Sequence, residues 1–440
     1  MMISRSKKQK TSFTPLLMIT VLAIFSFILK DYNLPIIAGY GLFLILAFFF
    51  IGVYGGKIYF SKTQFAAIIL ALIATVMVFL PYSRTAVNTV SVVMSLDIAM
   101  LYILICRPSE YDVERTMRML VVAAVVMSAY AIAVSIYPNV YYGFVKHIIP
   151  SDTQSLIELG FRYHYGVSVG GESIVVDYYA FFGIVIALNS LLIKRRELKD
   201  RNKYVAIFVV CALAIIVQNR KAELFTTLIV IVFLFLSNVN VTSLKQKWKQ
   251  ILAFSFIAVI GITAFIILLR KGYLSRYETF LTQLALRNSS VSSTVDISSG
   301  RTMLWGRALS LFKEHPVFGI GWGNFRNYLS DTFNVFNDGQ LSNVHNNYLQ
   351  ILCETGIVGF IFFVIPLFYI LYRTFKTIKY LRINMTNNYV ARIAASTSLS
   401  FQLFYLGISF IDPVWYKMFT WPFYGISVIL MIYAEKAEAY

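Results

Sequence analysis

Hydrophobic residues in this chain gather in about twelve long runs, with short polar segments between them. A helix needs about 20 apolar residues to cross the hydrocarbon core of a bilayer, and each run comes close to that length. The pattern predicts transmembrane helices over 13–29, 34–54, 63–80, 86–106, 116–137, 173–193, 204–219, 222–237, 251–269, 347–372, 391–411 and 418–434. The predicted fold class is therefore all-α, a polytopic membrane bundle of about 12 helices.

The composition strengthens this prediction. Apolar residues make up 58% of the 440 positions and charged residues 14%, against about 45–50% and about 25% in an ordinary soluble protein. Cys106, Cys211 and Cys353 all fall within apolar runs, so a disulfide framework is not expected. These observations exclude a soluble enzyme, a small disulfide-rich protein and a disordered chain.

The net charge of +18 indicates orientation rather than nucleic-acid binding, because Lys and Arg concentrate on the cytoplasmic side of membrane proteins. If the N-terminus is cytoplasmic, 24 of the 39 basic residues fall in the segments that face the cytoplasm. The even number of spans then places both termini in the cytoplasm. We expect the basic loops to contact anionic lipid, and we expect no nucleic-acid partner.

Two long external connections, 138–172 and 270–346, divide the chain into four segments. Residues 1–172 hold five spans and the first external loop, and 173–269 hold spans six to nine. Residues 270–346 form the large external loop, and 347–440 hold the last three spans and a cytoplasmic tail. A loop of 77 residues usually carries function when it is ordered.

The large loop contains a predicted amphipathic helix. Apolar residues recur with the spacing of one helical face, at Leu304, Trp305, Ala308, Leu311 and Phe312. Ser298 or Ser299 should cap the start of the helix, and Pro316 should end it after His315. We expect this helix on the outer membrane surface or at the mouth of the bundle. The glycines of 319–323 then form a tight turn or, as the alternative, an amide nest for phosphate.

The densest polar cluster lies where this loop re-enters the membrane. Asn346 or Asn347 is a natural N-cap for the next helix. His345 would then lie at the positive end of that helix, which should keep its ring neutral and able to accept a proton. Asn347, Gln350 and Glu354 follow on one face, and such residues are costly in a membrane unless they face the protein interior or a wet cavity. We favour a functional site over a capped helix with a structural carboxylate.

A second unusual cluster is the short turn at 218–223, which the predicted topology places on the external side. Arg220 is unexpected there, because Lys and Arg are normally in excess on the cytoplasmic side. Its guanidinium either reaches toward lipid headgroups or holds a fixed position facing the bundle. Arg162 and His164, in the loop 138–172, are weaker candidates for substrate contact. Asp97 and Asp177 lie in predicted spans, and we expect them to be partners of a buried cation rather than catalysts.

These residues carry a family resemblance. The chain over about 200–365 resembles the shared domain of the O-antigen ligases and polymerases, with matching motifs at Ser299-Gly300-Arg301, Trp305, His315-Pro316, Gly319 to Phe325, His345 to Gln350 and Glu354-Thr355-Gly356. Arg301 and His345 match the family's loop arginine and re-entry histidine. Arg220 resembles the family's arginine after a span, although this chain has Asn-Arg-Lys where the family more often has Ser-Arg-Gly.

The resemblance implies a glycosyltransferase on the extracytoplasmic face of the bacterial cytoplasmic membrane. The donor would be a glycan on undecaprenyl diphosphate, and the acceptor a sugar hydroxyl on a lipid-linked repeat unit or on lipid A core. Arg220 and Arg301 would bind the leaving diphosphate bidentately, and His345 would take the acceptor proton or orient the hydroxyl. The predicted substrate-binding residues are Arg162, Asn346, Gln350 and Glu354. This chemistry requires neither a metal nor a cofactor.

The resemblance leaves the exact reaction open. The external loop 138–172 adds surface for a second lipid-linked substrate, which favours a polymerase of O-antigen, capsule or exopolysaccharide repeat units, working with a chain-length regulator. The first alternative is a ligase that transfers the glycan to lipid A core or another terminal acceptor. The alternative from another class is a lipid-linked oligosaccharide transporter, but transporters are commonly built from matching halves and no internal repeat is visible.

Overall fold

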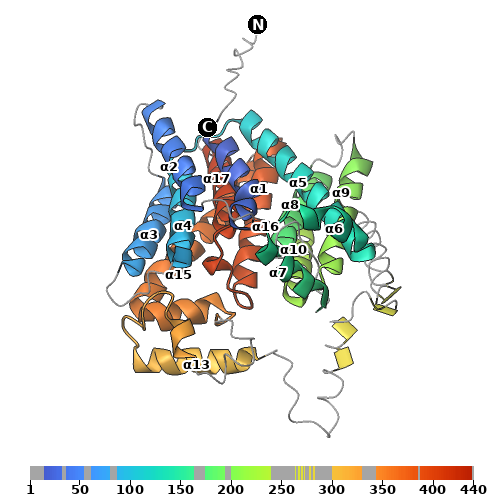
Figure 1. Cartoon of the computed structure of the whole chain (residues 1–440). Helices are drawn as coiled ribbons and strands as arrows, with labels where there is room; N and C mark the ends of the chain where they lie inside the picture. Colours follow the sequence, from blue (N-terminus) through green and yellow to red (C-terminus); the bar gives the residue numbers. More distant parts are fainter. Residues whose placement is uncertain are drawn as a thin grey trace.

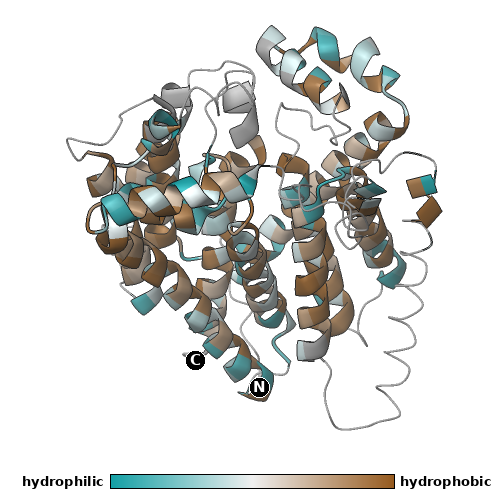
Figure 2. Ribbon diagram, turned by 90° about the horizontal axis from the view of Figure 1, so that it is seen from below, coloured by the Kyte–Doolittle hydropathy of each residue, from teal (hydrophilic) through white to brown (hydrophobic). Residues whose placement is uncertain are grey.

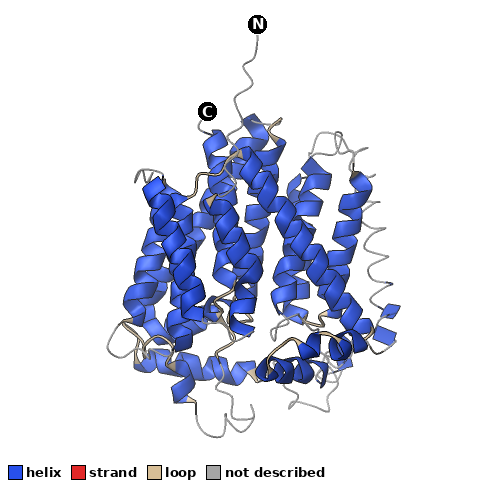
Figure 3. Cartoon of the chain, turned by 45° about the horizontal axis from the view of Figure 1, so that its top comes forward, coloured by secondary structure: helices blue, strands red, loops and turns tan. Residues whose placement is uncertain are grey.

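The computed structural model describes residues 14–31, 36–53, 61–79, 87–162, 174–193, 200–238, 300–329, 343–384 and 387–438, with a few single positions between 263 and 282. Within these residues the regular secondary structure is helical and includes no strand (Figure 3). The predicted all-helical fold class is confirmed.

The long helices coincide with the predicted spans. In chain order they are α1 (Pro15–Asp31), α2 (Ile36–Val53), α3 (Lys62–Val78), α4 (Val87–Ile105), α5 (Glu110–Ile136), α8 (Ile174–Ile193), α9 (Arg201–Val217), α10 (Lys221–Asn238), α15 (Asn347–Asn384), α16 (Tyr389–Ile408) and α17 (Thr420–Glu438). By length and composition, α5, α8 and α15 are able to cross a membrane. The predicted span 251–269 falls almost entirely outside the described residues, so the full count of twelve stays a prediction.

Short helices lie between the long ones. They are α6 (Asn139–Gly143), η1 (Val145–His147), α7 (Ser151–Arg162), α13 (Arg301–Glu314), η2 (Phe325–Tyr328) and η3 (Val414–Tyr416). Figure 1 places α13 at one end of the bundle and the last turn of α17 at the opposite end. This arrangement agrees with a large loop and a C-terminus on different sides of a membrane. The predicted division into four segments is not tested by it.

Helix α8 lies inside the bundle and is buried along its length from Ile174 to Ser190. It is apolar on every side, as expected for a helix surrounded by others, and it packs against α5, α9 and α16. Phe181 stacks on Phe404 of α16 with ring centroids 4.1 Å apart. A Cβ at Gly183 would lie 2.8 Å from the Cβ of Ala124 in α5. Small residues at such contacts let membrane helices approach closely.

The outer surface of the long helices is apolar, and Figure 2 shows hydrophobic residues dominating these helices. Large side chains are more than half exposed on several of them, including Ile45, Phe49, Val122, Ile229 and Ile365. A soluble monomer rarely exposes so much contiguous apolar surface, whereas hydrocarbon tails are a suitable solvent for it. The chain is an integral membrane protein.

Helix α15 is not one straight helix. It is broken at Gly356, whose φ of 64° and ψ of −170° are not helical. A Cβ there would lie 2.3 Å from the carbonyl of Val317, so the position requires glycine. The prediction of a single span over 347–372 is therefore corrected. A short helical segment, 347–355, precedes the main helix because the loop after α13 packs against the break.

The loop after α13 supplies the hydrogen bonds that the break removes. Carbonyls of the loop accept from the amides just after the break, in the pairs Pro316–Ile357 (2.9 Å) and Val317–Val358 (3.3 Å). Amides of the loop donate to the carbonyls just before it, in the pairs Ile320–Cys353 (3.0 Å) and Gly321–Glu354 (2.8 Å). Backbone groups at helix ends need such partners, so this loop is fixed to the bundle.

The predicted amphipathic helix is confirmed as α13. Its apolar face is buried against the loop and the first segment of α15, in a cluster made of Leu304, Ala308, Leu311, Ile320, Phe325, Leu329, Val344 and Cys353. The helix ends at Glu314 with His315 as the C-cap, next to Pro316 as predicted. The predicted serine cap is wrong, because the N-cap is Gly300 in a left-handed conformation without a side-chain cap.

Candidate active site

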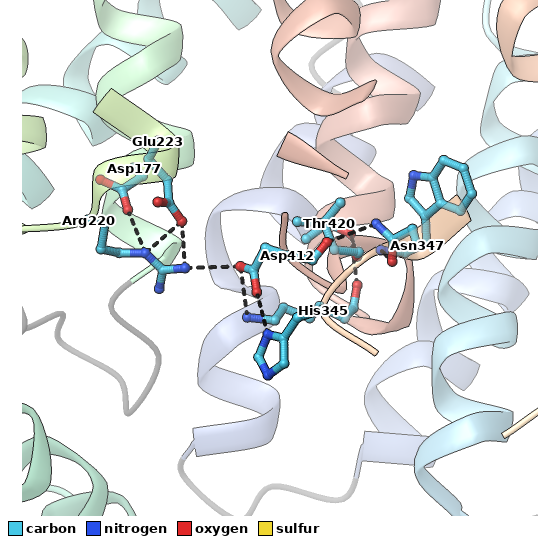
Figure 4. Close-up of polar contacts among 10 residues, drawn as sticks. Asp177, Arg220, Glu223, His345, Asn347, Asp412 and Thr420 are labelled. Atoms are coloured by element: carbon cyan, nitrogen blue, oxygen red, sulfur yellow. Dashed lines mark hydrogen bonds and ion pairs between the residues drawn. The ribbon is translucent and has the colours of Figure 1, made fainter. Parts of the chain in front are cut away.

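Arg220 lies in a three-residue turn between α9 and α10. Before it, Asn219 has a left-handed backbone with φ of 59°, a conformation common at helix C-termini that Asn tolerates well. The carbonyl of Arg220 accepts from the amide of Leu224 at 3.2 Å and so begins α10. This tight reversal directs the guanidinium toward α8 and toward the turn after α16 (Figure 4).

Three carboxylates surround the Arg220 side chain. Its Nε donates to Oε1 of Glu223 at 2.6 Å and lies 3.6 Å from Oδ2 of Asp177. Its Nη2 donates to Oδ2 of Asp412 at 2.9 Å. The side chain is 17% exposed, and burial alone would lower the pKa of Arg220, but the charges of Glu223, Asp412 and Asp177 outweigh burial and raise it. Arg220 is therefore a charged group that faces the bundle, not one that reaches toward headgroups.

The two carboxylates predicted inside spans have different partners. Asp177 pairs with Arg220, so the prediction that it contacts a buried cation is confirmed. Asp97 instead accepts a hydrogen bond from the hydroxyl of Thr75 at 2.9 Å. Among the contacts described for Asp97 the partner is thus neutral, and a cationic partner for that residue stays a prediction.

Asp412 lies in the turn between α16 and η3 and contacts three basic side chains. Besides its hydrogen bond with Arg220, Oδ2 lies 3.7 Å from Nζ of Lys417, and Oδ1 lies 3.8 Å from Nδ1 of His345. Burial would raise the pKa of the Asp412 carboxyl, but Lys417, His345 and Arg220 together hold that pKa well below its usual range. Asp412 is therefore ionised and connects Arg220 with His345.

His345 precedes the N-cap of α15 and has a left-handed backbone with φ of 54°. Such a conformation is uncommon for a residue other than glycine and often occurs at functional sites. The 3.8 Å separation from Asp412 is longer than a hydrogen bond. The imidazole is 36% exposed and directs Nε2 away from Asp412 (Figure 4). A substrate can therefore reach the ring from the side opposite the carboxylate.

Two asparagines fix the start of α15. The Oδ1 of Asn346 accepts from the amide of Leu349 at 3.1 Å, so Asn346 is the N-cap. The Nδ2 of Asn347 donates to the carbonyl of Asp412 at 3.0 Å, and its Oδ1 accepts from the amide of Trp415 at 3.3 Å. Asn347 is fully buried. It joins the beginning of α15 to the turn that carries Asp412.

The rest of the polar stripe faces the protein interior, as predicted. The carboxylate of Glu354 accepts hydrogen bonds from four groups, the amides of Gly323 (2.9 Å) and Phe325 (3.1 Å), the hydroxyl of Tyr416 (2.6 Å) and the side chain of Gln350 (3.3 Å). The glycine segment thus forms a tight turn whose amides bind Glu354. The substrate-binding role of Gln350 and Glu354 stays a prediction.

The remaining candidates lie at the ends of surface helices. Arg301 is the first residue of α13 and is half-buried. Because α13 packs against α15, Arg301 lies at the same end of the bundle as His345. Arg162 is the last residue of α7. Its side chain and the whole of His164 lie outside the part of the chain that the structure describes.

Sequence reasoning missed Asp412, Lys417 and Glu223. The available signal was the same one that singled out Arg220, charged residues in an external turn too short to leave the bundle. Residues 412–417 connect two predicted spans and contain both an acid and a lysine. That pattern does not show which residues of distant turns meet, because the contact depends on how α8, α10 and α16 pack.

Comparison with known proteins agrees with the resemblance seen in the sequence. Residues 199–364 match the model of a family described as O-antigen ligase, a segment that contains Arg220, Arg301 and His345. A protein of Haemophilus influenzae, described only as uncharacterized, is 26% identical over 212 residues, which cover 43% of this chain and 48% of that protein. The match thus spans about half the length of this relative. The resemblance to the O-antigen ligase and polymerase superfamily is confirmed, and residues 199–364 are the domain that carries it.

Proposed function

We propose that this protein is a membrane glycosyltransferase that moves a glycan from undecaprenyl diphosphate to a sugar hydroxyl at the extracytoplasmic face of the inner membrane. The observation that carries the proposal is the connected group Arg220–Asp412–His345 at the end of the bundle where α13 lies. It combines a largely buried guanidinium, 17% exposed, with a partly exposed imidazole beside a carboxylate. Such a group suits the departure of a diphosphate and the removal of a proton.

The acceptor half of the reaction involves His345 and Asp412. The acceptor oxygen forms a bond to the anomeric carbon while the bond from that carbon to the diphosphate oxygen breaks. The hydroxyl proton passes to Nε2 of His345, and Asp412 beside Nδ1 orients the ring and stabilises the imidazolium that forms. The alternative is that His345 only positions the hydroxyl.

The charge beside His345 favours proton uptake. The carboxylate of Asp412 is ionised and lies 3.8 Å from Nδ1 of His345. A proton on His345 therefore gains a negatively charged partner, which stabilises the state that follows proton transfer.

The donor half involves Arg220 and Arg301. Charge on the diphosphate increases as the glycosidic bond breaks, and preorganised guanidinium groups stabilise that charge. Arg220 already binds carboxylates through Nε and Nη2, so a diphosphate would share this guanidinium with Glu223 and Asp412. Arg301, at the start of α13, would supply the second guanidinium.

A polymerase that lengthens lipid-linked repeat units, acting with a chain-length regulator, is the specific activity that we favour. The loop 138–172 supports it because α6, η1 and α7 add external surface on which a second lipid-linked substrate fits. A ligase acting on lipid A core is the alternative. In a deletion strain, loss of long chains with one repeat still attached indicates a polymerase, and loss of all attached chains indicates a ligase.

The enzymatic proposal is tested with the purified chain in liposomes that contain a lipid-linked glycan donor. New glycosidic bonds between donor and acceptor support it, with mass spectrometry as the readout. Movement of the lipid-linked glycan across the bilayer without new bonds indicates a transporter and overturns it.

A further inference from the structure

A cavity of about 210 Å³ opens between α10, α15 and α16, far from the Arg220–Asp412–His345 group. It is lined by Phe233, Ser237, Phe375, Ile378, Lys379, Arg382, Ile383 and Leu399. Ser237 lies near the end of α10, whose start adjoins Arg220, and Arg382 lies near the end of α15, whose start adjoins His345. The cavity is therefore at the end of the bundle that the distribution of basic residues places in the cytoplasm.

The walls of this cavity divide into an apolar part and a cationic part. Phe233 of α10 and Phe375 of α15 contact edge to face, with ring centroids 5.9 Å apart. Lys379 and Arg382 follow Phe375 on the same face of α15, one and two turns along. None of the eight lining residues is acidic. This division matches an anionic phospholipid: the apolar walls suit an acyl chain, and the two cations suit a phosphate.

The cationic part is held in place by the protein. The Nη1 of Arg382 donates to the carbonyl of Ser237 at 2.6 Å, across from α15 to α10. Arg382 also borders a second, narrower hollow that reaches Arg392 of α16. Two helices, α15 and α16, thus bring basic side chains to one place, and α10 supplies the carbonyl that holds Arg382. A guanidinium fixed in this way can bind phosphate without losing much rotamer freedom.

The cavity reaches the outer surface of the bundle. Two of its lining residues are exposed there, Phe375 to 40% and Ile383 to 68%. In the cytoplasmic leaflet, where anionic headgroups lie, basic pockets between transmembrane helices bind such lipids. We propose that this cavity binds one anionic phospholipid of the cytoplasmic leaflet, with the phosphate at Lys379 and Arg382 and the start of an acyl chain over Phe233 and Phe375.

The experiment measures lipid binding by the intact chain in detergent, with native mass spectrometry as the readout. The probes are phosphatidylglycerol, cardiolipin and phosphatidylcholine. We expect one tightly bound anionic lipid and no equivalent phosphatidylcholine adduct. Lys379→Gln and Arg382→Gln should each weaken phosphatidylglycerol binding about fivefold, the amount expected for one cation near a headgroup. Lys376→Gln, which removes an exposed lysine of the same helix outside the cavity, is the matched control and should bind like the parent.

A second variant separates binding from folding. Ser237→Phe fills the cavity but keeps the Ser237 carbonyl that accepts from Arg382, so it should abolish the tight adduct even if Arg382→Gln unfolds. Equal binding of phosphatidylcholine, displacement of the lipid by excess inorganic phosphate alone, or unchanged binding in Lys379→Gln and Ser237→Phe would each overturn the proposal. The readout does not depend on glycan transfer, so it stands apart from the proposed function.

Discussion

Arg220 and His345 were singled out separately from the sequence, and Asp412 brings them into one group. The carboxylate lies 2.9 Å from Nη2 of Arg220 and 3.8 Å from Nδ1 of His345. Its ionisation depends on both of them and on Lys417. At the residue scale the site is therefore a coupled network, in which removal of one member changes the charge balance of the others.

Alanine substitutions test the three predicted catalytic residues. Arg220→Ala and Arg301→Ala should each lower glycan transfer about 100- to 1000-fold, since each removes a preorganised donor to the leaving group. His345→Ala should lower transfer about 100-fold or more if the ring is the base. Initial rates in liposomes provide the measurement. His315→Ala is the control, because this exposed C-cap of α13 should affect stability more than turnover.

Lysine at position 220 separates two roles of the arginine. Nζ of a lysine is a single point charge and cannot hold Glu223 and Asp412 through two separate nitrogens. We expect Arg220→Lys to stay far below the parent rate, with normal insertion into the membrane. If this variant transfers glycan like the parent, the geometry of the guanidinium is unimportant and Arg301 alone stabilises the leaving group. If His345→Ala keeps near-normal turnover, the imidazole is not an essential base. Positioning of the two substrates is then the main source of the rate acceleration.

Asp412→Asn should lower both activity and stability, and the stability loss has a defined pH dependence. The folded-state pKa of Asp412 lies below its unfolded value of about 3.9, so its charge stabilises the fold above that value and the contribution is lost only as pH falls through the folded-state pKa. In a His345→Ala background, which removes the titratable partner of Asp412, thermal unfolding in detergent should therefore show the same loss for Asp412→Asn at pH 5 and pH 8. A difference that changes between these two pH values would show that another group is responsible.

At the scale of elements, the break in α15 and the loop that packs on it form one unit. Gly319 and Gly356 both have positive φ angles, and a Cβ on Gly319 would lie 2.4 Å from the backbone of Glu354. The loop amides bind both the carbonyl and the carboxylate of Glu354. This unit holds Tyr416 and hence the turn that carries Asp412. It therefore supports the site without containing its reactive groups.

Gly356→Ala should destabilise the protein by more than about 2 kcal/mol. The φ of 64° and ψ of −170° at this position lie in a region that essentially only glycine adopts, at a cost of about 1–3 kcal/mol to other residues, and the added Cβ meets backbone at 2.3 Å. Gly306→Ala is the matched control. Gly306 is exposed in α13 with no atom near its Cβ position, and alanine there should stabilise the helix by about 0.5–1 kcal/mol. Thermal unfolding of both variants provides the measurement. Equal stabilities would show that the break is not required.

At the scale of the whole molecule, the two polar groups lie at opposite ends of the bundle. Arg220, His345 and Asp412 mark one end, and the ion pair of Arg373 with Glu435, 2.7 Å long, marks the other. The distribution of Lys and Arg predicts that the second end is cytoplasmic. With that orientation the candidate active site would face outward, where we propose that it meets its lipid-linked glycan donor.

Reporter fusions test this orientation. Fusions in 194–203 and 373–390 should read cytoplasmic, and fusions at 285–295 should read external, because a membrane protein keeps its basic loops inside. Alkaline phosphatase and a fluorescent protein are suitable reporters. A cytoplasmic reading near 290 would reverse the orientation and would place the active site on the wrong face for the proposed donor.

The sequence by itself determined most of the helices and the family resemblance of residues 199–364. A run of apolar residues predicts a helix locally, because in a bilayer only a helix satisfies the backbone groups of a single segment. The periodicity of 301–315 predicts α13 for a different reason, because its spacing places the apolar residues on one helical face. Motifs at fixed spacing identified Arg220, Arg301 and His345, since these residues stand close to recognisable local signals.

Only the tertiary structure decided which of these residues meet. Asp412 is 192 residues from Arg220 and 67 from His345, and no local pattern encodes that contact. The same holds for the break at Gly356, which forms because a loop from another part of the chain supplies the missing hydrogen bonds. The cavity beside Arg382 likewise exists because three helices pack imperfectly. Contacts of this kind depend on how the helices pack around α8. That packing is determined by the whole chain and not by any short segment of its sequence.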